Sequence, residues 1–184
     1  LVGGLTNSGV LEASSGRALA LLSGSTIVGT LLNTGTVAGQ ATGIAFSRST
    51  LVGGLVNTGL VSSTGLGIGL QQSQVLAGLT NAGTVLGGAA GVQASGSTIA
   101  GGLTNTGLVA GTTGVGVRLV GGAITGGLVN AGTVSAATAG LAFSQGTVVG
   151  GLTNTGLVEA SSGPAVLLDN GSVVAGGLHN DGTV

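Results

Sequence analysis

The chain of 184 residues contains 42 glycines, one proline, two phenylalanines and no cysteine, methionine, tryptophan or tyrosine, and only 4% of its residues are charged. The glycines lack a three-residue period and proline is nearly absent, which excludes collagen, while an apolar fraction of 42% argues against a disordered segment. A formal net charge of −1 from three arginines and four acids excludes a basic stripe for nucleic acid, and the lack of cysteine excludes disulfide and thiolate-metal frameworks.

A repeat of 24 to 26 residues begins at the first coil and continues to the end of the chain. Its marker is an asparagine inside the frame Leu-x-Asn-x-Gly. A fixed period of this size is typical of a solenoid, in which each repeat stacks on its neighbours. The eight copies are Asn7, Asn33, Asn57, Asn81, Asn105, Asn130, Asn154 and Asn180.

Within one repeat, apolar residues alternate with small or polar residues, which indicates strands, and the glycine and β-branched content disfavours helices. In the third repeat we expect three short strands, over about residues 51–56, 59–62 and 67–71. The turns should fall near Asn57-Thr58, Ser63-Thr64 and Gln72-Ser73, where turn-forming residues cluster. The sequence therefore predicts an all-β protein, a parallel β-helix solenoid of 24–26 residues and three short strands per coil.

The prediction places equivalent residues of successive coils in inward columns. One column holds Leu5, Leu31, Leu55, Leu79, Leu103, Leu128, Leu152 and Leu178. A second holds Leu11, Val37, Val61, Val85, Val109, Val134, Val158 and Val184. A third holds Ile27, Leu51, Val75, Ile99, Ile124 and Val148, and Phe46 and Phe143 share a further column with Leu70, Ala94 and Leu119.

A longer period lies over the first. Residues 6–16 and 153–163 are near copies, offset by the same 147 residues that separate Asn7 from Asn154. Both of the 26-residue coils, Asn7 to Asn33 and Asn154 to Asn180, begin within these two copies. We therefore expect residues 1–184 to form a single solenoid segment of seven to eight coils within a longer, open-ended array, with any targeting sequence outside it.

The asparagine column has two interpretations. In the first it is a structural ladder, in which each side-chain amide donates to a carbonyl of the next coil. In this interpretation the asparagine tolerates a left-handed turn, helped by the glycine two residues later. In the second, the repeated amides form a binding site for a ligand such as a glycan. The ladder is the favoured interpretation.

Two neighbouring outward columns beside the asparagines are candidates for a lateral contact face. Thr and Leu alternate in one of them. The alternatives are ordinary β-propensity on a solvated strand, packing against another solenoid, or an ice-binding plane built from threonine rows. Ice binding favours two outward threonines side by side in each coil, and only Thr34-Gly-Thr36 provides such a pair. The residues of this candidate face are Thr34, Thr36, Thr58, Leu60, Thr84, Thr106, Leu108, Thr133, Thr155 and Leu157.

The units Gly-Gly-Leu-Thr-Asn-Thr-Gly-Leu-Val and Thr-Gly-Ile-Ala-Phe (42–46), repeated along all 184 residues, resemble the repetitive β-helical passenger regions of bacterial autotransporter adhesins and filamentous-haemagglutinin-like surface proteins. The resemblance implies a right-handed β-helix displayed outside a bacterial cell or on its surface. It concerns the style of the repeat and implies no catalytic residue.

Residues with catalytic or metal-binding chemistry are few. His179 is the only histidine and occupies an outward position, where a surface substitution is the ordinary explanation. Glu12 and Glu159 are copies six coils apart, roughly 29 Å at the spacing of stacked strands, and cannot act as a catalytic pair. The glycine-rich residues 111–116 have no lysine and open a strand, so they are not a phosphate loop. We expect no catalytic, cofactor or metal site.

The low charge predicts an exterior of Ser, Thr, Gln, Gly and Ala, without the charge that normally keeps proteins apart. We therefore expect self-association, end to end or lateral, and a structural or adhesive role as an extracellular rod or fibre rather than an enzyme. The alternative is a solenoid that binds a glycan or an ice surface through outward Thr and Asn columns. No stretch reaches the roughly 18 apolar residues of a membrane-spanning helix, and no transmembrane segment or nucleic-acid partner is expected.

Overall fold

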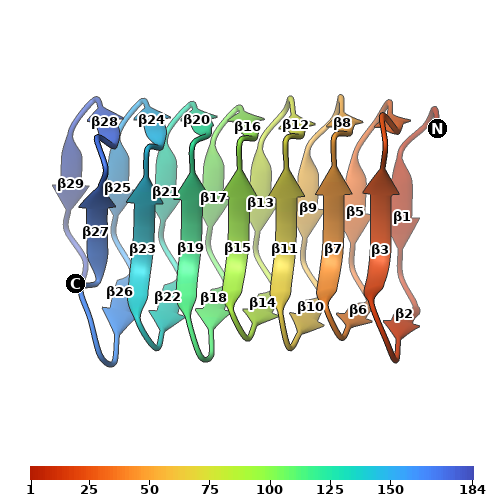
Figure 1. Cartoon of the computed structure of the whole chain (residues 1–184), viewed down its shortest axis with the longest axis horizontal. Coiled ribbons are helices and arrows are strands. Elements are labelled where there is room, and N and C mark those ends of the chain that lie inside the picture. The colour runs from red at the N-terminus through yellow and green to blue at the C-terminus, as the bar shows by residue number, and fades with distance from the viewer.

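The computed structural model describes residues 1–184 and contains 29 strands and no helix. The strands form four parallel sheets, each assembled from one strand of every coil (Figure 1). In Figure 1 the chain rises along the front strands, descends along the rear strands and advances from the N-terminus at the right to the C-terminus at the left, so the coil is right-handed. The predicted fold class, a right-handed parallel β-solenoid, is confirmed, in agreement with the usual hand of parallel strand connections.

Two of the sheets flank the asparagine positions. Sheet 1 contains β1 (Leu5–Asn7), β5 (Leu31–Asn33), β9 (Leu55–Asn57), β13 (Leu79–Asn81), β17 (Leu103–Asn105), β21 (Leu128–Asn130), β25 (Leu152–Asn154) and β29 (Leu178–Asn180). Sheet 2 contains β2 (Val10–Ala13), β6 (Thr36–Gly39), β10 (Leu60–Ser63), β14 (Thr84–Gly87), β18 (Leu108–Gly111), β22 (Thr133–Ala136) and β26 (Leu157–Ala160).

The other two sheets complete the coil. Sheet 3 has the longest strands: β3 (Arg17–Leu22), β7 (Thr42–Ser47), β11 (Leu66–Gln71), β15 (Ala90–Ser95), β19 (Val115–Val120), β23 (Ala139–Ser144) and β27 (Val166–Asp169). Sheet 4 has the shortest: β4 (Thr26–Ile27), β8 (Thr50–Leu51), β12 (Gln74–Val75), β16 (Thr98–Ala100), β20 (Ala123–Thr125), β24 (Thr147–Val149) and β28 (Val173–Ala175).

Each complete coil therefore has four strands, and the prediction of three was wrong at one place. The strand expected over residues 51–56 is divided into β8 and β9, because the chain bends at Val52 and Gly53. In a later coil, Gly101 and Gly102 at the same corner have φ of +81° and +87°, a region that side chains other than glycine rarely enter. A Cβ on Gly102 would also lie 2.8 Å from the carbonyl oxygen of Gly127. The other two strands agree with β10 and β11 to within one residue.

The longer coils keep the register of the sheets because their extra residues lie at corners. Three residues (14–16) separate β2 from β3, where two (40–41) separate β6 from β7. Three residues (23–25) likewise separate β3 from β4, where two (48–49) separate β7 from β8. The single extra residue of the 25-residue coil lies between β18 and β19. Insertions are therefore absorbed outside the strands, and every strand still meets its equivalent in the next coil.

The inward columns form one continuous core. Register pairs join the leucines of sheet 1 from Leu5 to Leu178, and the column of sheet 2 from Leu11 to Val158. Phe46, Leu70, Ala94, Leu119 and Phe143 pair in sequence, as predicted. Side chains of the middle coils are buried, with Leu55, Val61 and Ile68 at 0% exposure. The predicted Val184 is 58% exposed and lies beyond the paired members of its column.

The corner between sheet 3 and sheet 4 begins with a left-handed residue in every coil. Five of these residues are not glycine, and φ is +50° at Arg48, +49° at Gln72 and +55° at Gln145. The equivalent Gly96 and Gly121 adopt nearly the same angle. For a residue with a Cβ, the left-handed conformation costs about 1–2 kcal/mol of conformational free energy. The corner therefore favours glycine, although the sequence varies there.

We predict that Gln72→Gly raises the free energy of unfolding by about 0.5 kcal/mol, because relief of the left-handed backbone exceeds the extra entropy of an unfolded glycine. The matched control is Gln74→Gly, two residues later in β12, where the backbone is extended and the same change should destabilise by about 0.5–1 kcal/mol. Urea denaturation of both variants checks the difference. Equal effects of the two changes would contradict the argument.

Candidate functional site

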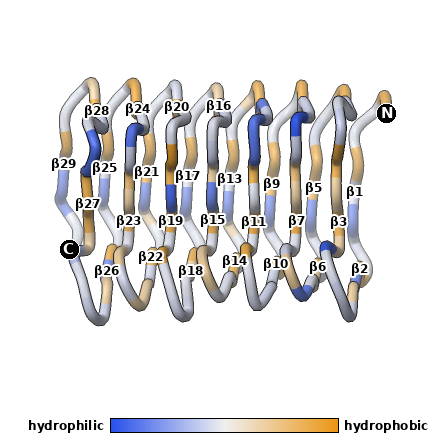
Figure 2. The backbone as a smooth tube through the Cα atoms, in the orientation of Figure 1, coloured by the Kyte–Doolittle hydropathy of each residue, from blue (hydrophilic) through white to orange (hydrophobic).

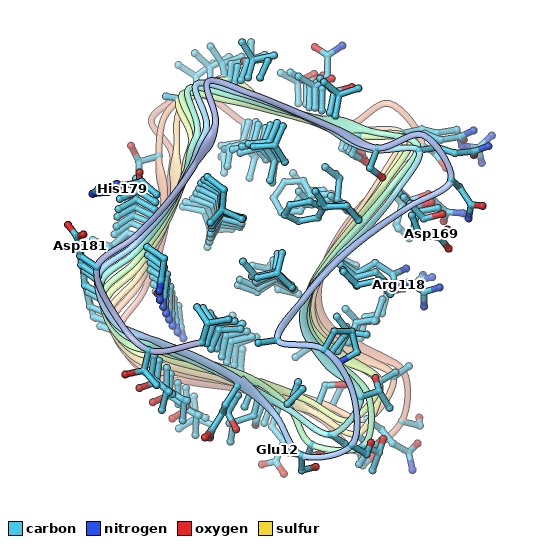
Figure 3. All side chains as sticks on the ribbon, turned by 90° about the vertical axis from the view of Figure 1, so that its left-hand side faces the viewer. Glu12, Arg118, Asp169, His179 and Asp181 are labelled. Carbon is cyan, nitrogen blue, oxygen red and sulfur yellow. The ribbon has the colours of Figure 1, made fainter.

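The asparagine ladder is the most regular polar feature of the molecule, and it lies inside the coil. The asparagines from Asn33 to Asn154 are at most 1% exposed. Each is the last residue of its strand in sheet 1, and its side chain points inward beside the leucine column (Figure 3). The backbone at these residues is not left-handed, so that part of the prediction was wrong.

The amide groups join consecutive coils directly. The Nδ2 of Asn81 donates to Oδ1 of Asn105 at 2.8 Å, to the carbonyl oxygen of Leu108 at 3.0 Å and to that of Gly83 at 3.2 Å. The Oδ1 of Asn81 accepts from Asn57 at 2.8 Å. The same four contacts recur at each interior asparagine, and no buried side-chain nitrogen or oxygen lacks a partner. The predicted donation to a carbonyl of the next coil is confirmed, and the amide-to-amide bond is added to it.

Backbone hydrogen bonds close the turn that follows each asparagine. The amides of Thr58 and Gly59 both donate to the carbonyl of Asn33 in the preceding coil, at 2.8 and 3.1 Å. Gly59 is required here because a Cβ at this position would overlap the carbonyl of Gly35. The glycine of Leu-x-Asn-x-Gly thus permits close stacking of successive turns and is not needed for a positive φ.

A second, shorter ladder of serines was missed by the sequence reasoning. Ser49, Ser73 and Ser97 are buried at the corner between sheets 3 and 4. The amide of Ser49 donates to Oγ of Ser73 at 3.1 Å, and the amide of Ser73 donates to Oγ of Ser97 at 3.0 Å. Their 24-residue spacing was visible in the sequence. Serine also occupies exposed turn positions such as Ser14, Ser15 and Ser162, so the spacing by itself does not indicate burial.

The candidate lateral face occupies sheet 2 and the turn before it. The alternating column Val10, Thr36, Leu60, Thr84, Leu108, Thr133 and Leu157 is paired in register, as expected, and is partly exposed beyond the first coil. In the turn column, Thr34, Thr58, Thr106 and Thr155 are exposed. The hydroxyls of Thr34, Thr58 and Thr106 donate to asparagine carbonyls of the preceding coil at 3.3–3.5 Å. These threonines therefore also stabilise the stack.

The charged side chains are distributed singly over the outside (Figure 3). Glu12 on β2 and Glu159 on β26 occupy opposite ends of the seven-stranded sheet 2. His179 pairs with Thr153 in register, as predicted, and its Nε2 lies 2.8 Å from Oδ2 of Asp181, with both side chains about two-thirds exposed. No group of three or more His, Cys, Asp or Glu side chains is arranged to hold a metal ion.

Three shallow hollows mark the outer surface. Two lie on sheet 3, where the outline in Figure 3 is indented near the labelled Arg118 and Asp169. The first has a volume of about 190 Å³ over Gly69, whose missing side chain leaves the space, and Arg17 and Gln93 border it. The second, of about 420 Å³, contains Arg118 and Asp169. The third, of about 340 Å³, lies on sheet 2 beside Glu159, which accepts a 2.9 Å hydrogen bond from Ser135.

No protein-family model, curated protein or solved structure matches the chain. The structure contains no helix of the length and apolar character needed to cross a membrane. Function has to be argued from the coil itself, which presents regular internal ladders and a sparsely charged exterior.

We predict that Asn81→Ala lowers the free energy of unfolding by about 2–4 kcal/mol, because it removes a buried amide, leaves Oδ1 of Asn105 without its donor and takes one of three acceptors from Nδ2 of Asn57. Asn180→Ala is the matched control. Asn180 is exposed and its Nδ2 donates only to the carbonyl of Gly182, so a loss below about 1 kcal/mol is expected. Guanidinium denaturation measures both, and equal losses would show that the buried ladder has no special importance.

Proposed function

We propose that this chain is a structural or adhesive rod of a bacterial surface or secreted protein, with no catalytic role. The observation that carries the proposal is the uninterrupted register of all coils. Four sheets and an internal amide ladder run the whole length of the chain, and no group of three or more His, Cys, Asp or Glu side chains gathers along them. Such a coil is a stiff spacer, since bending it requires hydrogen bonds between neighbouring coils to break.

Sparse charge supports the adhesive part of the proposal. The exterior carries only three arginines and four acids, distributed over different sheets and corners. Contacts with another copy or with surface glycans then face little charge repulsion. The buried amides are unavailable to a ligand, because their hydrogen-bonding groups are used within the stack. Ligand binding would have to use the outward threonines, several of which already donate to backbone carbonyls. The structural role is therefore favoured over the ligand-binding alternative.

Extracellular display rests on the resemblance of the repeat to autotransporter and filamentous-haemagglutinin-like passenger regions. The chain contains no lysine, and two of its three arginines, Arg48 and Arg118, lie among ordered stacked coils. Proteases that need an extended, accessible segment find few sites in such a stack. This resistance suits a protein exposed to an unprotected environment.

The test is immunogold electron microscopy of the source cells, with antibodies raised against the folded 184-residue chain. We expect label on projections or filaments outside intact cells, and loss of the label after extracellular proteinase K only at high enzyme concentration. A cytoplasmic protein labelled in parallel controls for leakage. Label that appears only after the cells are permeabilised would refute the proposal.

A further inference from the structure

The outward side chains of sheet 4 form an uncharged strip along the rod, mostly aliphatic in one of its two columns, which we call the neutral face. Its first column pairs in register and contains Thr26, Thr50, Gln74, Thr98, Ala123, Thr147 and Val173. Its second column lies two residues later and contains Val28, Val52, Leu76, Ala100, Thr125, Val149 and Ala175. In Figure 2 the tube along the upper edge, which contains sheet 4 with both its inward and outward residues, is mostly orange or pale.

The fold gives no reason for the second column of this strip to be mostly aliphatic. Val28, Val52, Leu76 and Val149 are 41–45% exposed, while the residues immediately before them point into the core. Polar residues at these positions would leave the core unchanged. Scattered exposed aliphatic residues are ordinary on protein surfaces, but aliphatic residues that recur at one column position in several coils mark an interaction surface.

The neutral face also lacks charge. Among the residues of sheet 4, and of the segments that lead from it into sheet 1, there is no Asp, Glu, Lys, Arg or His. Figure 3 shows the labelled charged side chains on the left, right and lower sides of the coil, and none on the upper side. Arg48 lies at the corner beside the face, where its backbone starts the turn into β8. A nucleic acid or a charged peptide would find no complementary group on this strip.

We propose that the neutral face binds the same face of a second copy, with the two rods antiparallel and related by a two-fold axis at the level of Thr98 and Ala100. Any partner must match a row of side chains that repeats at the strand spacing, and a second copy has that period by construction. The proposal rests on the structural role proposed above and specifies its contact surface.

Side-chain size selects the antiparallel arrangement. A two-fold axis across the strip places each column opposite itself, with coils at equal distance from Thr98 facing each other. The bulkiest coil, Gln74 and Leu76, then meets the coil of Ala123 and Thr125, which has the smallest first-column residue. Val28 similarly faces Ala175. In a parallel pair, Gln74 would face Leu76 and Ala123 would face Thr125, which places bulk opposite bulk and leaves a gap at Ala123, so packing would be poorer.

The association of this chain should be weak. A strip about four residues wide and seven coils long measures about 13 by 34 Å, or about 450 Å² per copy. The total of about 900 Å² lies below the size of stable interfaces and within the range of transient ones. We expect the dimer fraction to rise between about 10 µM and 1 mM protein. Each additional coil would extend the strip, so longer arrays would bind more tightly.

Cysteine cross-linking tests the arrangement, because the chain has no cysteine of its own. A short bismaleimide is used, since packed sheets lie about 10 Å apart and a disulfide reaches only about 7 Å between Cα atoms. Thr98→Cys should cross-link to itself at least ten-fold faster than Thr84→Cys, a control at a similarly half-buried threonine on sheet 2. Thr50→Cys should link efficiently only when mixed with Thr147→Cys.

Efficient linking of Thr50→Cys to Val52→Cys instead would indicate parallel rods and overturn the antiparallel proposal. Equal cross-linking rates for Thr98→Cys and Thr84→Cys would refute the proposal that the neutral face is a contact surface.

Sedimentation equilibrium gives an independent test. The double variant Val52→Lys and Leu76→Lys should weaken dimerisation at least ten-fold, whereas Leu60→Lys and Leu108→Lys on sheet 2 should leave it within two-fold. Circular dichroism confirms that both remain folded. Equal weakening by both pairs would indicate general charge repulsion and refute the face. If the cross-links fail while immunogold still labels external filaments, this contact surface is wrong and the rod function stands.

Discussion

Vertical register between successive coils is the constraint on which the whole molecule depends. A strand of two to six residues in one coil has no partner within that coil, so its backbone groups are satisfied only by the coils above and below. The asparagine ladder extends the same requirement to side chains, because each buried amide needs its equivalent one coil away. A shift of one coil by one residue would break both systems at once, and it would also turn core leucines outward.

Because the interior secures the register, the corners and the outer columns are free to vary. Extra residues enter only between strands, and the left-handed corner accepts Ser, Arg, Gln, Gly or Asn. The outer column of sheet 3 ranges from Gly69 to Arg118 without disturbing the inward column beside it. This separation explains how one scaffold carries different surfaces. Information about partners must therefore lie in the outward columns, and the proposed neutral face consists of two of them.

The separation between a fixed interior and variable outer columns also limits the catalytic chemistry that the fold can support. Residues brought together by stacking are copies of one another, so the fold multiplies one side chain and does not assemble different ones. A catalytic site needs unlike groups at short distance, and here no three His, Cys, Asp or Glu side chains gather in one place. Repetition favours extended contacts in which many weak, identical interactions add along the length. A stiff rod with a repeated lateral contact is the function that such a surface supports.

The sequence alone determined the period, the all-β solenoid, the inward columns and the asparagine ladder, because a residue that recurs every 24 to 26 positions must meet the same surroundings in every coil. Only the tertiary structure decided how the coil bends. The division of residues 51–56 into two strands, the extended backbone of the asparagines and the serine ladder all depend on how closely the backbones of neighbouring coils approach. A linear period carries no information about that distance.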